Sequence, residues 1–260
     1  MSAVANRVLT AGTPSLWIRE PMCSLYCQGC GYPILQRLLC DLMEEMSIGG
    51  KAIGCAGAGC VATFFQALNI DAHHGAHGRP PDVATAIKRL RPEAFVFTVQ
   101  GDGDAIAIGT EPLIQSAARG ENITIIMANN GGYGNTGGQM APTTLLGQVT
   151  TTTPEGRKDA LHGFPIRVAE LMVLLDGVCY SARGSLTSPA HYTRTKKYVK
   201  TAFQKQLEGA GLGFVEVLLP CPTNWHLGPL ESMKWIEERV MPQFPLGEFK
   251  NVAKAGAPKD

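Results

Sequence analysis

Residues 93–110 read "EAFVFTVQGDGDAIAIGT" and combine a strand, a turn and the start of a helix. The apolar run 94–99 is expected to form a buried strand, because it is short, rich in β-branched and aromatic residues, and followed by glycine. The stretch 105–120 that comes next is helix-like. A strand that leads through a glycine turn into a helix is the repeating unit of α/β proteins.

The same alternation continues on both sides of this stretch. Further strands are expected at residues 51–54, 123–130, 177–185 and 214–220. Further helices are expected at residues 33–46, 81–90, 191–209 and 229–240. This order predicts an α/β fold with a mainly parallel sheet and helices on both of its faces. In such sheets, ligands bind at the carboxyl ends of the strands.

The composition limits the kinds of partner that the chain is expected to have. The chain has 260 residues, of which 45% are apolar, enough for one large domain with a substantial core. Its 23 basic and 22 acidic residues nearly balance, so no nucleic-acid surface is expected. No apolar run approaches the roughly 18 residues of a membrane span, and the N-terminus lacks an apolar signal core. We therefore expect a cytoplasmic protein that binds neither nucleic acid nor membranes.

An acid and an amide stand at the ends of two expected strands. Asp102 lies in the "GDG" that follows one strand, and Asn130 ends the next. Carboxylate and amide oxygens are ligands that Mg²⁺ accepts, usually together with substrate phosphates. The backbone carbonyl of Gly132 is a third candidate ligand. The alternative for Asp102 is a structural role, in which it caps the helix that begins near Ala105.

Eight cysteines is a high number for a cytoplasmic chain of this length, so metal ligation is favoured over disulfides. Four of them stand at expected strand or helix ends, namely Cys27, Cys30, Cys55 and Cys221. Four thiolates fit a [4Fe–4S] cluster or structural zinc, and the C-x-x-C pair alone also fits a redox dithiol. Cys60, five residues after Cys55, is the rival ligand. Cys40 and Cys179 lie in apolar surroundings and are expected to be buried.

Six motifs follow one another along the chain: "CQGCG", "IGC", "AHGRPPDVATAIK", "GDGDAIAIG", "NNGGYGNTGGQMAPTT" and "CPT". In this order they resemble the β subunit of 2-oxoacid:ferredoxin oxidoreductases, over about residues 20–250. The resemblance implies a thiamine-diphosphate-binding fold of the diphosphate-binding type. It implies a single domain over residues 1–260, with an N-terminal cluster-binding segment and a C-terminal extension. It also implies three cofactors: thiamine diphosphate, Mg²⁺ and a [4Fe–4S] cluster.

The resemblance assigns ligands to the cluster and the metal. The implied cluster ligands are Cys27, Cys30, Cys55 and Cys221. The implied Mg²⁺ ligands are Asp102, Asn130 and the carbonyl of Gly132. Tyr32 and Pro33 stand where the family often has a histidine, and "TEP" at residues 110–112 replaces another. Neither position is a cluster or metal ligand, so the implied ligand sets are unaffected.

The resemblance also names residues around the thiamine. Further cofactor-binding residues are implied in the glycine motifs and the "HGR" turn, namely His77, Arg79, Gly101, Gly103, Asp104 and Gln139. His77 and Arg79 are expected to contact the diphosphate or a neighbouring subunit. Asn135 resembles the polar residue that faces the reactive thiazolium carbon, with Thr136 beside it as the second catalytic residue. The alternative for these loops is turn chemistry on a solvated surface.

The resemblance further implies that the chain is half of an active site. No glutamate here matches the one that bonds the aminopyrimidine ring, which the family takes from a pyrimidine-binding α subunit. Further small subunits are also expected. The implied reaction is oxidative decarboxylation of a 2-oxoacid, in which coenzyme A takes the acyl group and ferredoxin the electrons. Residues 221–250 are most similar to members that act on 2-oxoisovalerate, with 2-oxoglutarate next.

Two other functions remain open from the sequence. A non-redox thiamine-diphosphate decarboxylase subunit would share "GDG" and "NN" but has no use for four cluster cysteines. A zinc-stapled α/β binding module would hold one zinc ion and no thiamine.

Overall fold

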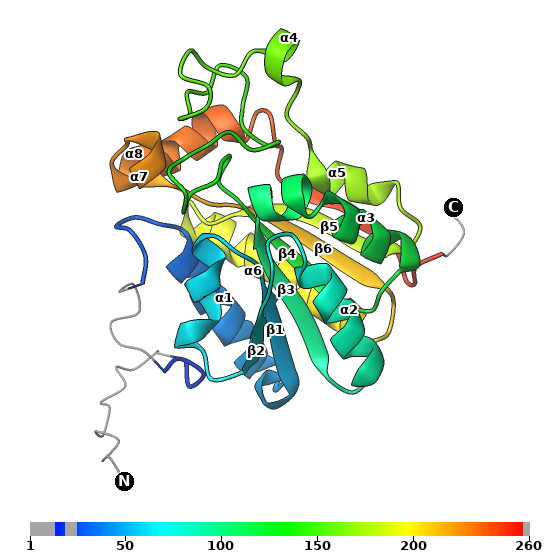
Figure 1. The fold of residues 1–260 in the computed structure, drawn as a ribbon. Helices are drawn as coiled ribbons and strands as arrows, with labels where there is room; N and C mark the ends of the chain where they lie inside the picture. The colour runs from blue at the N-terminus through cyan, green and yellow to red at the C-terminus, as the bar shows by residue number, and fades with distance from the viewer. Residues whose placement is uncertain (1–13, 19–24, 257–260) are drawn as a thin grey trace.

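A computed structural model of the chain describes residues 14–18 and 25–256 and is built around one seven-stranded sheet (Figure 1). In chain order the strands are β1 (Ala52–Ala56), β2 (Asp71–His74), β3 (Phe95–Gly101), β4 (Thr124–Asn129), β5 (Val178–Ser185), β6 (Leu212–Leu218) and β7 (Gly247–Asn251). Their order in the sheet is β2-β1-β3-β4-β6-β5-β7. Neighbouring strands are parallel except β7, which is antiparallel to β5. The predicted α/β class with a mainly parallel sheet is confirmed.

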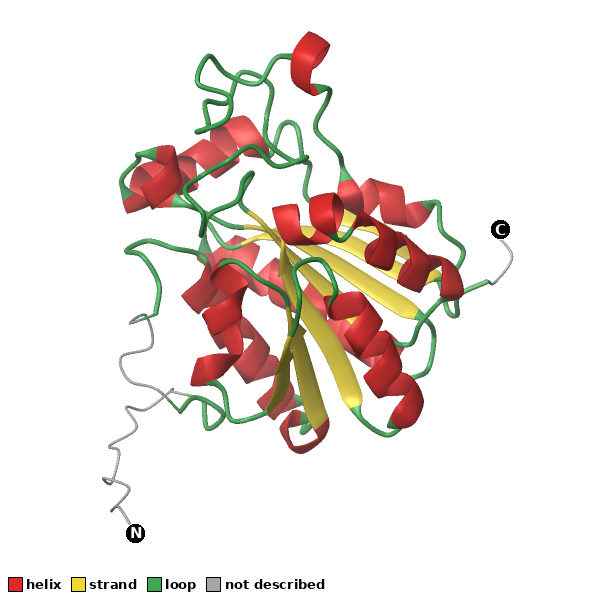
Figure 2. Ribbon diagram, in the orientation of Figure 1, coloured by secondary structure: helices red, strands yellow, loops and turns green. Residues whose placement is uncertain are grey.

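Helices cover both faces of the sheet (Figure 2). Their bounds are α1 (Tyr32–Glu45), α2 (Pro80–Leu90), α3 (Thr110–Arg119), α4 (Asp159–His162), α5 (Val168–Val173), α6 (Pro189–Leu207), α7 (Pro222–Trp225) and α8 (Pro229–Trp235). α1 and α6 pack on one face, together with a 3-10 segment over Cys60–Ala67. α2, α3 and α5 pack on the other face. In the described part of the chain, no helix is long and apolar enough to cross a membrane.

Strand β3 shows how the core forms. Phe95, Phe97 and Val99 point into the layer that holds α1 and α6, whereas Val96 points into the opposite layer. This alternation follows from the two-residue period of a strand. Phe203 of α6 packs edge-on against Phe95, with ring centroids 4.7 Å apart. A parallel strand covered on both faces needs apolar residues at nearly every position, which is why this run is recognisable in the sequence.

The helix expected at 105–120 is interrupted. A π-helical turn over Asp104–Ile108 precedes α3, and the two meet at Gly109. Gly109 lies against Gly78, so that a Cβ on Gly109 would come within 2.7 Å of the Gly78 carbonyl oxygen. The break therefore lets the "HGR" turn pack directly beside the "GDGD" motif.

The sequence pattern does not predict the two edge strands, β2 and β7. β2 carries Asp71, His73 and His74, and its residues are exposed. β7 has no fully buried residue. Edge strands face solvent along one side, so they lack the continuous apolar run that marks the central strands.

The loop over residues 131–156 has little regular structure, and a single buried side chain holds it in place. Arg157 donates hydrogen bonds to six backbone carbonyls, those of Ala141, Pro142, Thr144, His162, Gly163 and Phe164. Only 4% of Arg157 is exposed. This guanidinium ties the middle of the loop to the segment that follows it, so the loop presents a fixed surface to the neighbouring motifs.

The aromatic contact between α6 and β3 predicts a large effect on stability. Phe203→Ala removes a fully buried ring and should lower the free energy of unfolding by about 3–5 kcal/mol. Leu90→Ala is the control, because Leu90 is 80% exposed, and it should change that free energy by less than about 0.5 kcal/mol. Urea denaturation of the two variants measures both values. Equal effects would show that the core does not lie between α6 and β3.

Candidate functional site

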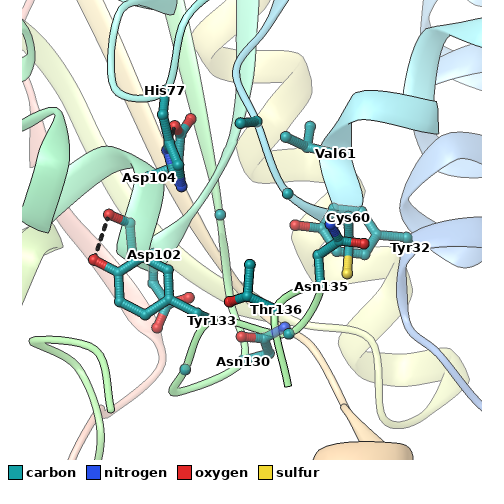
Figure 3. Close-up of a pocket in the computed structure, with 16 residues that line it drawn as sticks. Tyr32, Cys60, Val61, His77, Asp102, Asp104, Asn130, Tyr133, Asn135 and Thr136 are labelled. Atoms are coloured by element: carbon teal, nitrogen blue, oxygen red, sulfur yellow. Dashed lines mark hydrogen bonds and ion pairs between the residues drawn. The ribbon is translucent and has the colours of Figure 1, made fainter. Parts of the chain in front are cut away.

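A cleft opens at the carboxyl ends of β1, β3 and β4, where the sequence motifs meet (Figure 3). Its walls come from residues 58–61 after β1, residues 101–104 after β3 and residues 130–136 after β4, with His77 and Tyr32. The cleft has an empty volume of about 580 Å³, part of it open to solvent. Its position is the one expected for a ligand site in a parallel sheet.

Asp102 lies fully buried at the base of the cleft. It follows directly on β3, and its carboxylate accepts a hydrogen bond from the hydroxyl of Thr143 in the long loop. Burial raises the pKa of Asp102 to about 7, and the hydrogen bond from Thr143 only partly offsets this rise. The carboxylate therefore lacks a positive charge nearby to stabilise its ionised form.

Asn130 and Gly132 bring two more oxygens to Asp102. With its amide turned to satisfy its neighbours, Asn130 donates from Nδ2 to the Gly132 carbonyl oxygen, at 2.7 Å, and to Oδ1 of Asp102, at 3.2 Å. Rotating the amide by half a turn would place its oxygen beside the other two oxygens instead. A carboxylate, an amide oxygen and a backbone carbonyl are then available to one cation, and this is a ligand set that hard cations accept. The residues present therefore fit Mg²⁺, with space in the cleft for diphosphate oxygens.

Asp104 organises the opposite wall of the cleft. Its buried carboxylate contacts Nδ1 of His77 and accepts hydrogen bonds from the backbone N–H of Gly78, at 2.6 Å, and from Gln100 Nε2, at 3.0 Å. Asp104 thus fixes the imidazole of His77, which lines the cleft (Figure 3). Both residues stand at the cavity that the sequence predicts for them.

Arg79, by contrast, lies outside the cleft. It is exposed and pairs with Glu111, at 2.9 Å, and with Asp82, at 3.4 Å. The expected contact between Arg79 and a diphosphate has no counterpart in this geometry. The reason is that the "HGR" turn directs His77 inward, whereas Arg79 becomes the residue before helix α2.

The loop after β4 supplies the outer wall. Asn135 and Thr136 are exposed and line the cleft, as the sequence predicts. Gln139 does not line it: its side chain bonds the hydroxyl of Thr136, at 2.6 Å, and the Thr136 carbonyl, at 2.8 Å. Gln139 therefore braces the loop behind the residues that face the cavity.

Tyr133 is a cleft residue that the sequence analysis missed. Its hydroxyl donates to the Gly103 carbonyl, at 3.3 Å, and its ring covers Gly103 so closely that a Cβ there would come within 2.5 Å. Gly103 is thus required by the contact with Tyr133. The only signal for this in the sequence was the position of Tyr133 between two glycines.

A second cavity adjoins the first and is lined by four cysteines: Cys27, Cys30, Cys60 and Cys221. It has an empty volume of about 640 Å³. Burial raises the pKa of the Cys30 thiol to about 12 and that of Cys60 to about 11, and the neighbouring cysteines raise both further. Thiols that influence one another in this way lie close together and stay protonated unless a positive centre holds them as thiolates.

Cys55 is not part of this cavity. It lies within β1, is fully buried and packs against the layer that holds α2 and α3. The sequence analysis ended this strand at residue 54, whereas β1 continues to Ala56, so that Cys60, not Cys55, follows its carboxyl end. The fourth cysteine of the cavity is therefore Cys60, which the sequence analysis treated as the rival ligand. Cys40 and Cys179 are buried as predicted, and Cys23 lies outside the described residues.

The four cysteines line one cavity that is partly open to solvent. Within the described ranges, no three His, Cys, Asp or Glu side chains are gathered tightly enough to hold a single ion. Zinc bound by four thiolates has Zn–S distances of about 2.3 Å and would require such a tight group.

The two cavities share a wall. Six residues line both: Tyr32, Gly59, Cys60, Asn130, Gly134 and Asn135. Asn224, another residue that the sequence analysis missed, donates to the Gly134 carbonyl, at 2.7 Å, and to the Sγ of Cys221, at 3.3 Å. A group in the cysteine-lined cavity would therefore lie next to a ligand in the cleft.

Comparison with known proteins agrees with this geometry. The family described as "Thiamine pyrophosphate enzyme, C-terminal TPP binding domain" matches residues 52–217. The chain is 38% identical to ketoisovalerate oxidoreductase subunit VorA of Methanothermobacter thermautotrophicus, over 89% of this chain and 48% of that protein. It is 32% identical to 2-oxoglutarate synthase subunit KorB of Archaeoglobus fulgidus, over 84% of this chain and 78% of that protein.

A solved structure shares the fold. The 2-oxoglutarate:ferredoxin oxidoreductase from Magnetococcus marinus, with 2-oxoglutarate, coenzyme A and succinyl-CoA bound, superposes with a TM-score of 0.73. The two are 23% identical, and the match covers 94% of this chain and 85% of that one. This chain spans about half the length of the VorA relative, at 48%, but most of the KorB relative, at 78%. The chain belongs to the β-subunit family of the 2-oxoacid:ferredoxin oxidoreductases and carries the thiamine pyrophosphate-binding domain of that family.

Proposed function

We propose that this chain is the diphosphate-binding half of a 2-oxoacid:ferredoxin oxidoreductase. It would hold Mg²⁺, thiamine diphosphate and a [4Fe–4S] cluster for the oxidative decarboxylation of a 2-oxoacid to an acyl-coenzyme A. The observation that carries the proposal is that Asp102, the Asn130 amide and the Gly132 carbonyl meet beside a cavity lined by four cysteines. Family membership supplies the reaction class.

The chain's own residues have distinct tasks in this proposal. Asp102, Asn130 and the Gly132 carbonyl hold the cation, whose remaining positions the diphosphate fills. Asp104 orients the imidazole of His77 toward the cavity. Thiamine diphosphate, once bound, acts as the electron sink for decarboxylation. The exposed side chains of Asn135 and Thr136 stand at the cavity wall, where they would contact the bound 2-oxoacid.

The ligands proposed for the cluster are Cys27, Cys30, Cys60 and Cys221. A [4Fe–4S] cluster takes four thiolates, and the membership of the chain in a ferredoxin-linked oxidoreductase family favours it over zinc. The wall shared with the cleft would keep the cluster within reach of electrons released beside it. Ferredoxin is the proposed acceptor.

The proposal also requires a partner chain. No Glu lines the cleft in the described part of the chain, so the acid that bonds the aminopyrimidine ring must come from elsewhere. A pyrimidine-binding α subunit is the proposed source, and further small subunits would complete the enzyme. The open side of the cleft leaves room for such a partner.

The metal site predicts a graded loss of cofactor affinity. Asp102→Ala removes the one charged ligand and should weaken thiamine diphosphate binding by at least about 100-fold, because losing even an outer partner of a metal ligand costs about 10–100-fold. Asn130→Ala removes a neutral ligand and should weaken binding less. Calorimetric titration in the presence of Mg²⁺ measures both affinities. The exposed Asp82→Ala is the control, and unchanged binding by the Asp102 variant would exclude the assignment.

The cysteine-lined cavity predicts a contrast between two residues close in sequence. Cys60→Ala should lose most of the iron and acid-labile sulfide, because one of four thiolates is gone. Cys55→Ala should keep both, because Cys55 lies in the core away from the cavity. Iron and sulfide analysis after anaerobic purification measures the difference. Loss of iron and sulfide in the Cys55 variant alone would show that Cys55 is the cluster ligand. Stoichiometric zinc without sulfide would rule out the cluster.

The lining of the cleft predicts substrate preference. A second carboxylate, as in 2-oxoglutarate, needs a fixed cation, yet no Lys or Arg lines the cleft among the described residues, and Arg79 is already paired. A branched apolar side chain needs only an apolar wall. An apolar pocket distinguishes two substrates that differ by one methylene by only about 1–3 kcal/mol of transition-state binding. We therefore propose that 2-oxoisovalerate and similar branched-chain acids are the substrates.

In the complex purified with its partner chains, kcat/KM for 2-oxoisovalerate should exceed that for 2-oxoglutarate by about tenfold or more, because the second carboxylate would be buried without a partner. Steady-state rates with a panel of 2-oxoacids measure this. A preference for 2-oxoglutarate would show instead that the partner supplies the missing cation.

A further inference from the structure

A series of contacting buried polar groups connects the interior of the sheet with the turn that carries the proposed metal ligands. Arg183 on β5 lies opposite Glu216 on β6 in the strand register, and both side chains are fully buried. Arg183 Nε lies 2.9 Å from one carboxylate oxygen of Glu216. The other oxygen accepts a hydrogen bond from Nδ2 of Asn129, at 2.7 Å. Asn129 is the first residue of the "NN" motif and the last of β4.

Asn129 passes this contact on to the turn that carries the metal ligands. Its side-chain oxygen accepts from the backbone N–H of Gly131, at 3.0 Å. Gly131 has a φ of +67°, a left-handed conformation that glycine adopts readily. The residues on either side of it, Asn130 and Gly132, carry two of the three groups proposed to bind the cation, and both lie beside Asp102. The direction of both oxygens therefore depends on a turn that Asn129 holds closed.

At the other end of this series, further contacts hold the charged side chain of Arg183 in place. The Arg183 guanidinium also pairs with both oxygens of Glu170 and donates to the Pro245 carbonyl, at 2.9 Å. The rings of Phe244 and Phe249 each lie 5.2 Å from its central carbon. Arg183 is thus held on every side and fixes the position of Glu216.

Burying an ion pair of this kind is rarely stabilising by itself, because desolvation of two charges costs about as much as their attraction returns. The contact between this ion pair and Asn129 gives the pair another role. We propose that Glu216 is a positioning residue that aims the Asn130 and Gly132 oxygens at Mg²⁺ through Asn129, with Arg183 keeping Glu216 in place. This inference rests on the proposed Mg²⁺–thiamine diphosphate site and names what preorganises it.

The hydrogen-bond pattern predicts what Glu216→Gln would do. The new amide can offer its oxygen to Arg183 or to Asn129, and the charged guanidinium takes it. The amide nitrogen then faces Nδ2 of Asn129, donor against donor. If Asn129 rotates to accept from it, its own nitrogen meets the N–H of Gly131. Either way one contact in the turn is lost, although the shape of the side chain is preserved.

An exchange of groups tests this directly. Combining Glu216→Gln with Asn129→Asp swaps the acid and the amide. The carboxylate at position 129 then accepts from both Gly131 and the new amide, whose oxygen faces Arg183. Mg²⁺-dependent binding of thiamine diphosphate is measured by calorimetry on the complex that co-purifies with the tagged chain, after cofactor removal with EDTA.

Glu216→Gln should weaken this binding at least about tenfold, as loss of an outer partner of a metal ligand does. The swapped pair should recover most of the affinity. Asn129→Ser leaves the ion pair between Arg183 and Glu216 intact and should show the same loss of affinity. This variant tests the proposal if Glu216→Gln does not fold. Tyr180→Phe is the matched control: it removes a hydrogen bond from a buried side chain to Glu248 and touches none of Arg183, Glu216 and Asn129, so it should lower the melting temperature and leave the affinity unchanged.

Three results would overturn the inference. They are wild-type affinity in both Asn129→Ser and a folded Glu216→Gln, no recovery in the swapped pair, or an equal loss in Tyr180→Phe. If the wild-type complex binds thiamine diphosphate without any need for Mg²⁺, the proposed function itself fails, and the inference fails with it.

Discussion

The parallel register between β3 and β4 is the constraint on which the site depends. Gly101 pairs with Ala128, so both strands reach the edge of the sheet together. Asp102 and Asn130 then lie side by side, although 27 residues separate them in the sequence. The Asn130 amide lies within hydrogen-bonding distance of Asp102 and of the Gly132 carbonyl, and burial raises the pKa of Asp102 to about 7. The proposed cation would favour the ionised carboxylate and would draw the amide and carbonyl oxygens toward one point.

Close packing of the loops makes the glycines of the motifs necessary. A Cβ at Gly57 would come within 2.4 Å of the Asp104 carboxylate, and one at Gly103 would meet Tyr133 at 2.5 Å. In both contacts a side chain of one segment packs directly on the backbone of another, which only glycine allows. The glycines therefore bring the segments after β1, β3 and β4 close enough to line one cleft.

The central strands, and the positions of Asp102 and Asn130 at strand ends beside the cleft, could be predicted because both leave local marks. Buried parallel strands give continuous apolar runs, and "GDG" and "NN" stand directly after them. The end of β1 could not be read from a short apolar run, so Cys55 was preferred to Cys60. The contact between Asn129 and Glu216 joins residues 87 positions apart, and nothing near either one indicates it. Contacts of that range need the sheet order, which periodicity does not supply.

Both cavities gather groups that are unfavourable when alone. One holds a buried carboxylate among other oxygens, and the other holds thiols whose pKa values burial raises. Burial disfavours the ionised carboxylate and the ionised thiolates, so each set becomes favourable as anions only beside a positive centre. Ligands that bind only the folded chain stabilise it by an amount that grows with their affinity and concentration. Because Cys60 and Asn135 belong to both walls, a group bound in one cavity would contact side chains that also line the other. In the proposed enzyme the metal cofactor and the cluster would therefore be held against one shared wall.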